Sequence, residues 1–193
     1  MKTKKYCLLL LVLMSFLASC SSTQNHNPVT GSELIGGSFS MTDHTGKKVT
    51  EKNFQGQYML VFFGFTSCPS VCPMGLSTMG RVMHKLPKEM EKQIQPIFVT
   101  VDPSRDTGKK MKSFMKSFYP RFTGLRGTQK ETEDMVFKYR GYYRKVFEDG
   151  EEEYLIDHSD IIYLMSKEGK YLGHFSSSNG VENIKNRIIK LLK

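Results

Sequence analysis

Two cysteines four residues apart are the part of the sequence best suited to chemistry. Cys68 and Cys72 lie between an apolar run at 58–63 and a helical pattern of apolar residues that follows Pro73. Both sulfurs are therefore expected near a helix N-terminus, where free backbone N–H groups and the helix dipole stabilise a thiolate. A thiolate can serve as a nucleophile, as a reductant or as a soft metal ligand.

The spacing of four residues brings the two sulfurs together, but it does not distinguish a disulfide from a metal site. With Cys68 in the loop and Cys72 in the first helical turn, both lie on one side, close enough for a disulfide or for one shared metal ion. A purely structural disulfide would close a very short loop and constrain little chain entropy. A peroxidase would need a threonine three positions before its cysteine, whereas Thr66 stands two positions before Cys68. Metal binding and thiol–disulfide exchange remain the main alternatives.

A histidine close to the sulfurs would favour a metal. Thiolates favour Cu(I) and imidazole suits both copper oxidation states, so two sulfurs and one nitrogen can hold either. His158 stands out because it lies in a polar interruption directly before the apolar strand 161–165, and such a loop can lean over a helix N-terminus opposite. The other four histidines occupy an N-terminal polar segment, a polar turn, a helix face and a returning strand: His26, His44, His84 and His174.

The elements that must position these residues indicate an α/β fold. In order, we expect a hairpin of 39–42 and 48–50, a strand at 58–63, a helix through 76–86, a strand at 94–101, helices at 107–118 and 131–139, a hairpin over 154–175 that turns at Glu168-Gly169, and a helix from 181. The run at 58–63 is apolar on both faces, as in a strand covered by helices on both sides. This order predicts a thioredoxin-like fold, with a central mixed sheet flanked by helices and an N-terminal β-hairpin.

The N-terminus has the features of a bacterial lipoprotein signal. Three lysines precede an apolar run at 8–14, which is too short for a well-anchored membrane span, and small residues lead directly to Cys20. This ending resembles a lipobox. It predicts that residues 1–19 are removed, that Cys20 is lipidated, and that the lipid anchors an exported protein to the extracytoplasmic face of a membrane, in the periplasm or at the cell surface.

Composition divides the rest of the chain into a tether and one domain. Residues 21–36 are rich in Ser, Thr, Asn and Gly, so we expect the lipidated cysteine and a flexible tether at 20–36 and a single domain at 37–193.

Without the signal, the chain has 25 basic and 19 acidic side chains, a formal charge of +6. The basic residues are scattered over helical stretches, which indicates a solvated face and argues against nucleic-acid binding.

Four separated motifs together resemble the Sco/SenC family of copper proteins. They are Gly64-Phe65-Thr66, Cys68-Pro69 with Cys72-Pro73, Thr100-Val101-Asp102-Pro103 with Arg105-Asp106-Thr107, and Asp157-His158-Ser159 before Tyr163-Leu164. The resemblance extends over residues 37–193, with the motifs in the family's order. It implies that Cys68, Cys72 and His158 bind one copper ion, as Cu(I) or Cu(II).

The resemblance also implies partners and a function. The family assists assembly of the dinuclear copper site of cytochrome c oxidase, so the expected partners are the apo copper site of a respiratory oxidase subunit, a thiol–disulfide reductant and a membrane. The alternative is an extracytoplasmic thiol–disulfide oxidoreductase in which Cys68 and Cys72 form the redox-active pair. Against general thioredoxin activity, the spacing exceeds CxxC by one residue and the chain has no tryptophan.

Two positions depart from the family pattern. Family members often carry Asp where Ser70 stands and His where Ser67 stands; neither position is one of the three ligands. Loss of a carboxylate beside the site can alter the copper-state preference or the contact with the recipient. Asp102 and Asp106 could support the metal ligands, but a strand-ending turn and a helix N-cap are the favoured roles. Methionine thioethers could also bind copper, but the spacing of four of them favours core packing on helix faces: Met79, Met83, Met111 and Met115.

Overall fold

The structure is a computed structural model that describes residues 35–147 and 153–193. The predicted signal at 1–19, the predicted lipidation site Cys20 and the tether up to residue 34 lie outside these residues. Within the described part, no helix combines the length and the apolar character needed to cross a bilayer. The lipid-anchored organisation of the N-terminus therefore stays a prediction.

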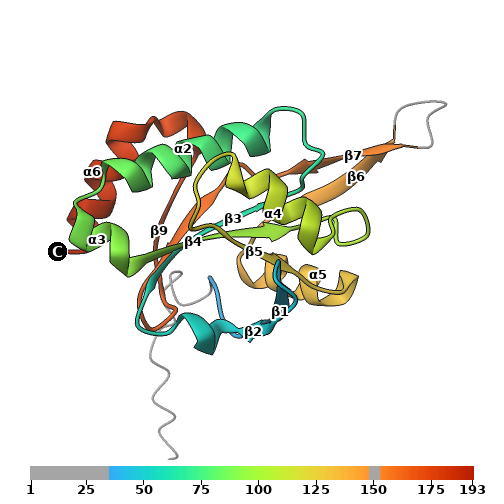
Figure 1. The fold of residues 1–193 in the computed structure, drawn as a ribbon, viewed down its shortest axis with the longest axis horizontal. Helices are drawn as coiled ribbons and strands as arrows, with labels where there is room; N and C mark the ends of the chain where they lie inside the picture. Colours follow the sequence, from blue (N-terminus) through green and yellow to red (C-terminus); the bar gives the residue numbers. More distant parts are fainter. Residues whose placement is uncertain (1–34, 148–152) are drawn as a thin grey trace, which may run out of the picture.

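A seven-stranded mixed sheet forms the centre of the molecule (Figure 1). Its strands, in spatial order, are β2 (Lys48–Thr50), β1 (Ser40–Asp43), β5 (Thr123–Arg126), β4 (Ile94–Thr100), β3 (Tyr58–Gly64), β8 (Ile162–Met165) and β9 (Tyr171–Phe175). Strands β3, β4 and β5 run parallel, whereas β1 and β8 pair antiparallel with β5 and β3. The predicted α/β class with a central mixed sheet is confirmed.

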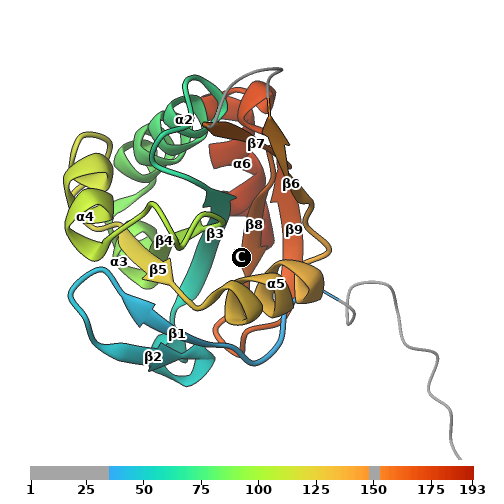
Figure 2. The same cartoon turned by 90° about the vertical axis from the view of Figure 1, so that its right-hand side faces the viewer.

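Helices cover both faces of this sheet. They are α2 (Val71–Lys85), α3 (Lys88–Gln93), α4 (Gly108–Lys116), α5 (Gln129–Lys138) and α6 (Val181–Leu191), with short 3-10 helices η2 (Glu51–Phe54) and η3 (Ser177–Asn179). Helices α2 and α6 lie together on one face and α5 lies on the other (Figures 1 and 2). Successive side chains of β3 point to opposite faces of the sheet. Phe62 packs against Gly75 of α2, whereas the ring of Phe63 lies 5.3 Å from the ring of Tyr139, the residue that follows α5.

The N-terminal hairpin is present as predicted. Strands β1 and β2 pair antiparallel, and β1 in turn pairs with β5, so the hairpin covers that edge of the parallel strands. Asp43 fixes the turn, because its Oδ1 accepts hydrogen bonds from the backbone N–H groups of Thr45 (2.8 Å) and Lys47 (3.0 Å). Gly46 adopts a φ of +97°, which favours glycine.

The segment before the last hairpin differs from the sequence prediction. Strand β7 (Tyr154–His158) pairs antiparallel with β6 (Tyr143–Phe147), a strand that the sequence analysis missed, and the two form a separate sheet. The hairpin that turns at Glu168-Gly169 consists of β8 and β9 alone. Asp160 lies between β7 and β8, and its Oδ2 accepts hydrogen bonds from Ser176 and Ser177, which follow β9.

Two further elements, β5 and α3, were also missed, and both are short. Strand β5 has four residues and α3 has six, too few to show a clear period in the sequence. The methionine prediction is confirmed: the four side chains on the faces of α2 and α4 are buried in the core, namely Met79, Met83, Met111 and Met115. Strand β5 approaches α4 at Gly124, where a Cβ atom would lie 2.7 Å from the methyl group of Met115.

Candidate metal centre

The loop between β3 and α2 places both cysteines at the start of the helix. Cys72 lies in the first turn of α2 and is fully buried, whereas Cys68 lies in the loop with 8% of its surface exposed. Gly64, at the end of β3, makes room for the site, because a Cβ atom there would lie 2.5 Å from the Cys72 Sγ. The predicted arrangement of loop cysteine and helix cysteine is confirmed.

Backbone N–H groups point at both sulfurs. The Cys72 N–H donates to the Cys68 Sγ (3.4 Å), and the Phe65 N–H donates to the Cys72 Sγ (3.4 Å). Ser70, at the N-cap of α2, makes no side-chain cap bond. One free N–H of the helix start thus serves the Cys68 sulfur, and an N–H just after β3 serves the Cys72 sulfur, which is an arrangement expected to favour a thiolate.

His158, the last residue of β7, completes the cluster. Its Nε2 lies 3.2 Å from the Cys72 Sγ and 3.9 Å from the Cys68 Sγ. Its Nδ1 lies 3.2 Å from the Ser159 carbonyl oxygen, which can only accept, so Nδ1 donates a hydrogen bond there and Nε2 faces the sulfurs. The rings of Phe62 and Phe65 meet the imidazole edge to face at 6.1 and 5.9 Å and limit its rotation.

The two thiols differ strongly in acidity. A hydrogen bond from Cys72 is the largest cause that lowers the pKa of Cys68, to about 4; burial opposes it, and a bond to His158 assists. The same bond and burial raise the pKa of Cys72 far above that of a free thiol. The bond between the two thiols therefore makes Cys68 the more acidic thiol of the pair.

The three donor atoms fit one metal ion. They all lie within 4.8 Å of one another, and no other group of three or more His, Cys, Asp or Glu side chains in the described residues meets this geometry. Metal–sulfur and metal–nitrogen bonds of about 2.3 and 2.0 Å separate neighbouring ligand atoms by roughly 3.5–4 Å. Two thiolates and an imidazole form a soft donor set, which suits Cu(I).

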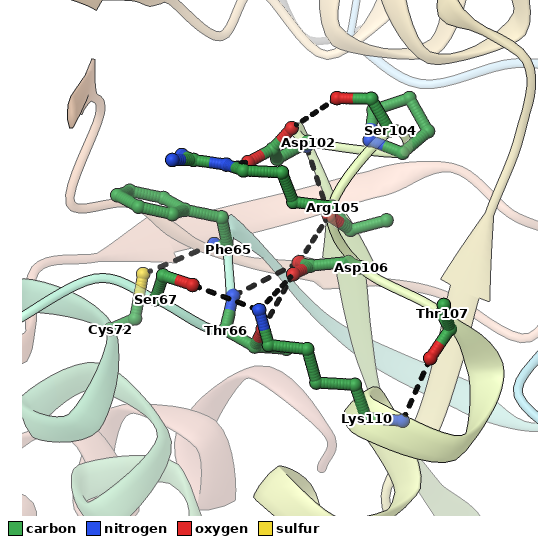
Figure 3. A network of polar contacts seen from close by, with 12 residues as sticks. Phe65, Thr66, Ser67, Cys72, Asp102, Ser104, Arg105, Asp106, Thr107 and Lys110 are labelled. Atoms are coloured by element: carbon green, nitrogen blue, oxygen red, sulfur yellow. Dashed lines mark hydrogen bonds and ion pairs between the residues drawn. The ribbon is translucent and has the colours of Figure 1, made fainter. Parts of the chain in front are cut away.

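Asp106 anchors the cysteine loop from a neighbouring turn (Figure 3). Its Oδ2 accepts hydrogen bonds from the Thr66 N–H (2.9 Å) and the Thr100 hydroxyl (2.7 Å), and its Oδ1 accepts one from the Thr66 hydroxyl. The prediction of Asp106 as N-cap was wrong: Thr107 caps α4 by accepting from the Lys110 N–H. The carboxylate is drawn inward because the cysteine loop offers it two donors and the end of β4 a third.

The other described histidines have separate environments. His44 Nδ1 accepts from the Gly124 N–H (3.1 Å), the His84 ring meets Tyr119 edge to face, and His174 bonds Tyr171. His26 lies outside the described residues. His158 is thus the histidine that the structure brings to the cysteines.

A groove of about 260 Å³ opens beside the cluster. Phe65, Cys68 and Pro69 line one side, and Val146, Leu155 and His158 line the other. Three residues that join these two sides were not predicted to have a role: Phe65, Arg105 and Tyr154. Arg105 stands in a noted motif, whereas nothing in the sequence distinguishes Tyr154.

Comparisons with known proteins identify the family of the chain. The family model described as SCO1/SenC matches residues 27–193. The human mitochondrial Protein SCO1 homolog is 38% identical over 149 residues, 77% of this chain and 50% of that protein, and a SCO2-like protein of Rickettsia conorii is 39% identical over 142 residues, 73% of this chain and 69% of that protein. The chain thus spans about half the length of the first curated relatives it matches.

Solved structures give the same result. Arabidopsis thaliana ScoI with copper bound has a TM-score of 0.77 at 35% identity and covers 82% of this chain and 98% of its own. Bradyrhizobium japonicum ScoI with copper bound has a TM-score of 0.74 at 36% identity and covers 81% and 99%. The predicted thioredoxin-like fold and family resemblance are confirmed: the chain belongs to the SCO1/SenC family.

Proposed function

We propose that this protein binds one copper ion through Cys68, Cys72 and His158 and delivers it to the apo copper site of a respiratory oxidase subunit, such as one of cytochrome c oxidase. The convergence of these three donor atoms within 4.8 Å carries the proposal. Copper-bound relatives of the same fold and the family's place in cytochrome oxidase assembly support it.

The chemistry of the donor set suits a carrier. Bound copper would be held by two thiolates and one neutral nitrogen, a set that accepts Cu(I) and, with changed geometry, Cu(II). The groove beside Cys68 gives a recipient's ligands an approach, so the ion can pass by ligand exchange. No substrate has to be turned over.

The proposal places the protein on the extracytoplasmic face of a membrane. The signal pattern at 1–19 and the lipobox-like ending at Cys20 support a lipid anchor. Metabolic labelling with a clickable fatty acid tests this: the wild type is expected to be labelled and Cys20→Ser to be unlabelled. Equal labelling of both would remove the anchor from the proposal.

Copper titration of the reduced full chain in mild detergent tests the site. One equivalent of Cu(II) is expected to give a sulfur-to-copper charge-transfer band and a defined electron paramagnetic resonance spectrum, both lost in Cys68→Ser and His158→Ala. His174→Ala is the matched control, because it removes an imidazole that bonds Tyr171 away from the sulfurs. Copper that binds the wild type and His158→Ala alike would overturn the three-ligand site.

A second candidate function is reduction of a partner's disulfide, favoured by the asymmetric acidity of the pair. The Cys68 thiolate would attack one sulfur of the partner disulfide, whose other sulfur leaves as a thiolate. Cys72 would then lose its proton and attack the Cys68 Sγ, releasing the partner as a dithiol and leaving a Cys68–Cys72 disulfide. A thiol reductant would restore the two thiols.

Trapping separates the two functions. Cys72→Ala is expected to accumulate a mixed disulfide with a disulfide-bonded peptide of an oxidase copper site, because no resolving thiol remains. Cys68→Ala is the control and should trap nothing. A wild-type protein that reduces the peptide without binding copper would place the oxidoreductase ahead of the carrier.

A further inference from the structure

The ligands of the site come from two parts of the molecule. Cys68 lies in the loop that links β3 of the main sheet to α2, and Cys72 lies in α2. His158 ends the β6–β7 sheet, which among the described residues shares no strand pairing with the main one. A separate contact must hold the imidazole over the sulfurs. Resting on the proposed copper function, we propose that Asp102 and Arg105 are positioning residues that hold β7, and through it His158, over the cysteine loop.

Asp102 and Arg105 both bind the first residue of β7. The Arg105 Nε forms an ion pair with Asp102 Oδ2, and its Nη1 donates to the Tyr154 carbonyl oxygen (2.9 Å). The Tyr154 hydroxyl donates to Asp102 Oδ1 (2.9 Å). Backbone and side chain of the same residue are thus held, which fixes both the position and the tilt of the strand.

The Arg105 guanidinium also connects β7 to the cysteine loop. It lies 3.8 Å from the centre of the Tyr154 ring and 5.8 Å from that of Phe65. The Phe65 ring meets the His158 imidazole edge to face at 5.9 Å, and the Phe65 N–H donates to the Cys72 Sγ. Figure 3 shows Arg105 extending over Phe65, with Cys72 beneath. The cation therefore lies between the two halves of the site.

A single turn serves both halves. Residues 102–106 connect β4 with α4, and the Asp106 N–H donates to the Asp102 carbonyl oxygen (3.0 Å), which keeps the turn tight. Asp106, at the end of this turn, binds Thr66 of the cysteine loop, and Asp102 and Arg105 of the same turn bind Tyr154. A displacement of the turn would move the sulfurs and the imidazole relative to each other.

The chemistry of the Asp102 and Arg105 side chains suits the positioning of β7 better than a contribution to folding stability alone. Asp102 is 1% exposed, and a buried ion pair is often no more stabilising than apolar side chains of the same volume. The planar guanidinium can pair with Asp102, bond a carbonyl oxygen and stack on a ring at the same time, which a lysine cannot do. The planar arrangement of N–H donors in the Arg105 guanidinium is therefore the property to test.

The experiment compares Arg105→Met and Arg105→Lys with a matched control in the full chain. Arg121→Met removes a guanidinium that bonds the carbonyl oxygens of Glu91 and Ile94 at the other end of β4. Three quantities are measured: Cu(I) affinity by competition with a chromophoric chelator, amide hydrogen exchange of the metal-free protein, and thermal unfolding. If Arg105→Met does not fold, Tyr154→Phe removes the hydroxyl contacts with Asp102 and Ser104 and keeps the ring.

Arg105→Met is expected to weaken Cu(I) binding about 10–100-fold, as loss of groups that orient metal ligands commonly does, and to speed exchange at β7 amides. Arg105→Lys should lose less affinity, and Arg121→Met should lower the unfolding temperature without either effect. Copper affinity and β7 exchange equal to the wild type in Arg105→Met would overturn the positioning role. A wild type that binds no copper would overturn the proposed function instead, and the exchange rates of the metal-free protein would still decide whether Arg105 holds β7.

Discussion

The main sheet and the β6–β7 sheet serve the same site in different ways. The main sheet fixes the sulfurs with buried packing and backbone bonds, and Cys72 has no exposed surface. The β6–β7 sheet carries the nitrogen at its end and exposes large apolar side chains at Val146, Phe147 and Leu155. Its strands extend beyond the main sheet (Figure 1). Two ligands are thus built into the core, and the third depends on a few side-chain contacts.

This division bears on how a carrier can release its ion. Removing a sulfur from its place would require moving the start of α2 and the packed residues around Gly64. Moving the nitrogen requires a shift of β7, which Arg105 and the buried Asp102 hold through hydrogen bonds to Tyr154. In ligand exchange, His158 is then the ligand whose support can change without unfolding the domain.

Truncating one phenylalanine in each region is the broadest test of this difference. Phe98 of β4 is fully buried, and Phe147 of β6 is 61% exposed. Phe98→Ala is expected to lower the free energy of unfolding by about 3–5 kcal/mol through lost burial and a cavity, and Phe147→Ala by less than about 0.5 kcal/mol. Denaturant titrations measure both values. Similar losses would show that the β6–β7 sheet is as much a part of the core as β4.

A methyl group added at Gly64 probes the fixed half more closely. The new Cβ would lie 2.5 Å from the Cys72 Sγ and 3.1 Å from the Phe98 ring, so Gly64→Ala is expected to cost about 1–3 kcal/mol by overpacking. It should also weaken copper binding, because Cys72 has to move. Gly173→Ala on β9 is the control, since its Cβ meets only Leu191 at 3.4 Å. Denaturation and copper titration of both variants measure these effects. A Gly64→Ala variant with the stability and copper affinity of the wild type would mean that the sulfur site is not rigid.

The half of the site that the sequence predicted well is the half built from local signals. An apolar run, two Cys-Pro steps and a helical period lie within one continuous segment, so the position of Cys68 before α2 and of Cys72 within its first turn follows from neighbouring residues. His158 was assigned through the family resemblance, because nothing local links it to residues 86 positions away.

The half that was misread depends on contacts distant in sequence. Strand β6 exposes most of its side chains and shows no period of two, so the sequence gives no sign that it pairs with β7. Asp106 has the context of an N-cap, yet it turns to Thr66, 40 positions earlier. Arg105 meets Tyr154 across 49 positions. The partners of such side chains depend on which donors and acceptors the fold brings close together, and a single sequence does not show this.

Acid titration of Asp102 tests the contact between the two regions. Burial raises the pKa of Asp102, but hydrogen bonds from Arg105, Ser104 and Tyr154 outweigh burial and hold it below the ordinary value. A carboxyl with a lowered pKa in the folded state stabilises it fully above the unfolded value of about 3.9, and this stabilisation is lost as pH falls through the folded value. Asp102→Asn should therefore cost about 1–3 kcal/mol at pH 7 and flatten the loss of stability in acid.

Denaturation of Asp102→Asn and the wild type at a series of pH values from 7 to about 2 measures this effect. Asp134→Asn, which removes an exposed carboxylate paired with Lys130, is the control and should follow the wild type. Parallel curves for Asp102→Asn and the wild type would mean that this carboxylate does not tie the two regions together in the way its bonds indicate.

The acidity of Cys68 gives the finest comparison, because both regions contribute to it. The largest cause of its pKa of about 4 is the bond from Cys72, in the main part, and the bond to His158 is a smaller one. Cys72→Ala is therefore expected to raise the pKa of Cys68 strongly toward that of free cysteine, near about 8.5, and His158→Ala to raise it less. The rate of alkylation by iodoacetamide as a function of pH measures each value, since the raised pKa of Cys72 keeps that thiol unreactive in neutral solution.

His174→Ala controls for the loss of an imidazole elsewhere on the surface and should leave the alkylation profile of Cys68 unchanged. The order of the two shifts decides the comparison. If His158→Ala moves the pKa of Cys68 as far as Cys72→Ala does, the thiolate is governed by the β6–β7 sheet, and the site cannot be divided into a fixed pair of sulfurs and a separately held nitrogen. If the smaller shift is found, Cys68 keeps a lowered pKa after His158 is removed, so the sulfurs remain prepared for the ion before the nitrogen arrives.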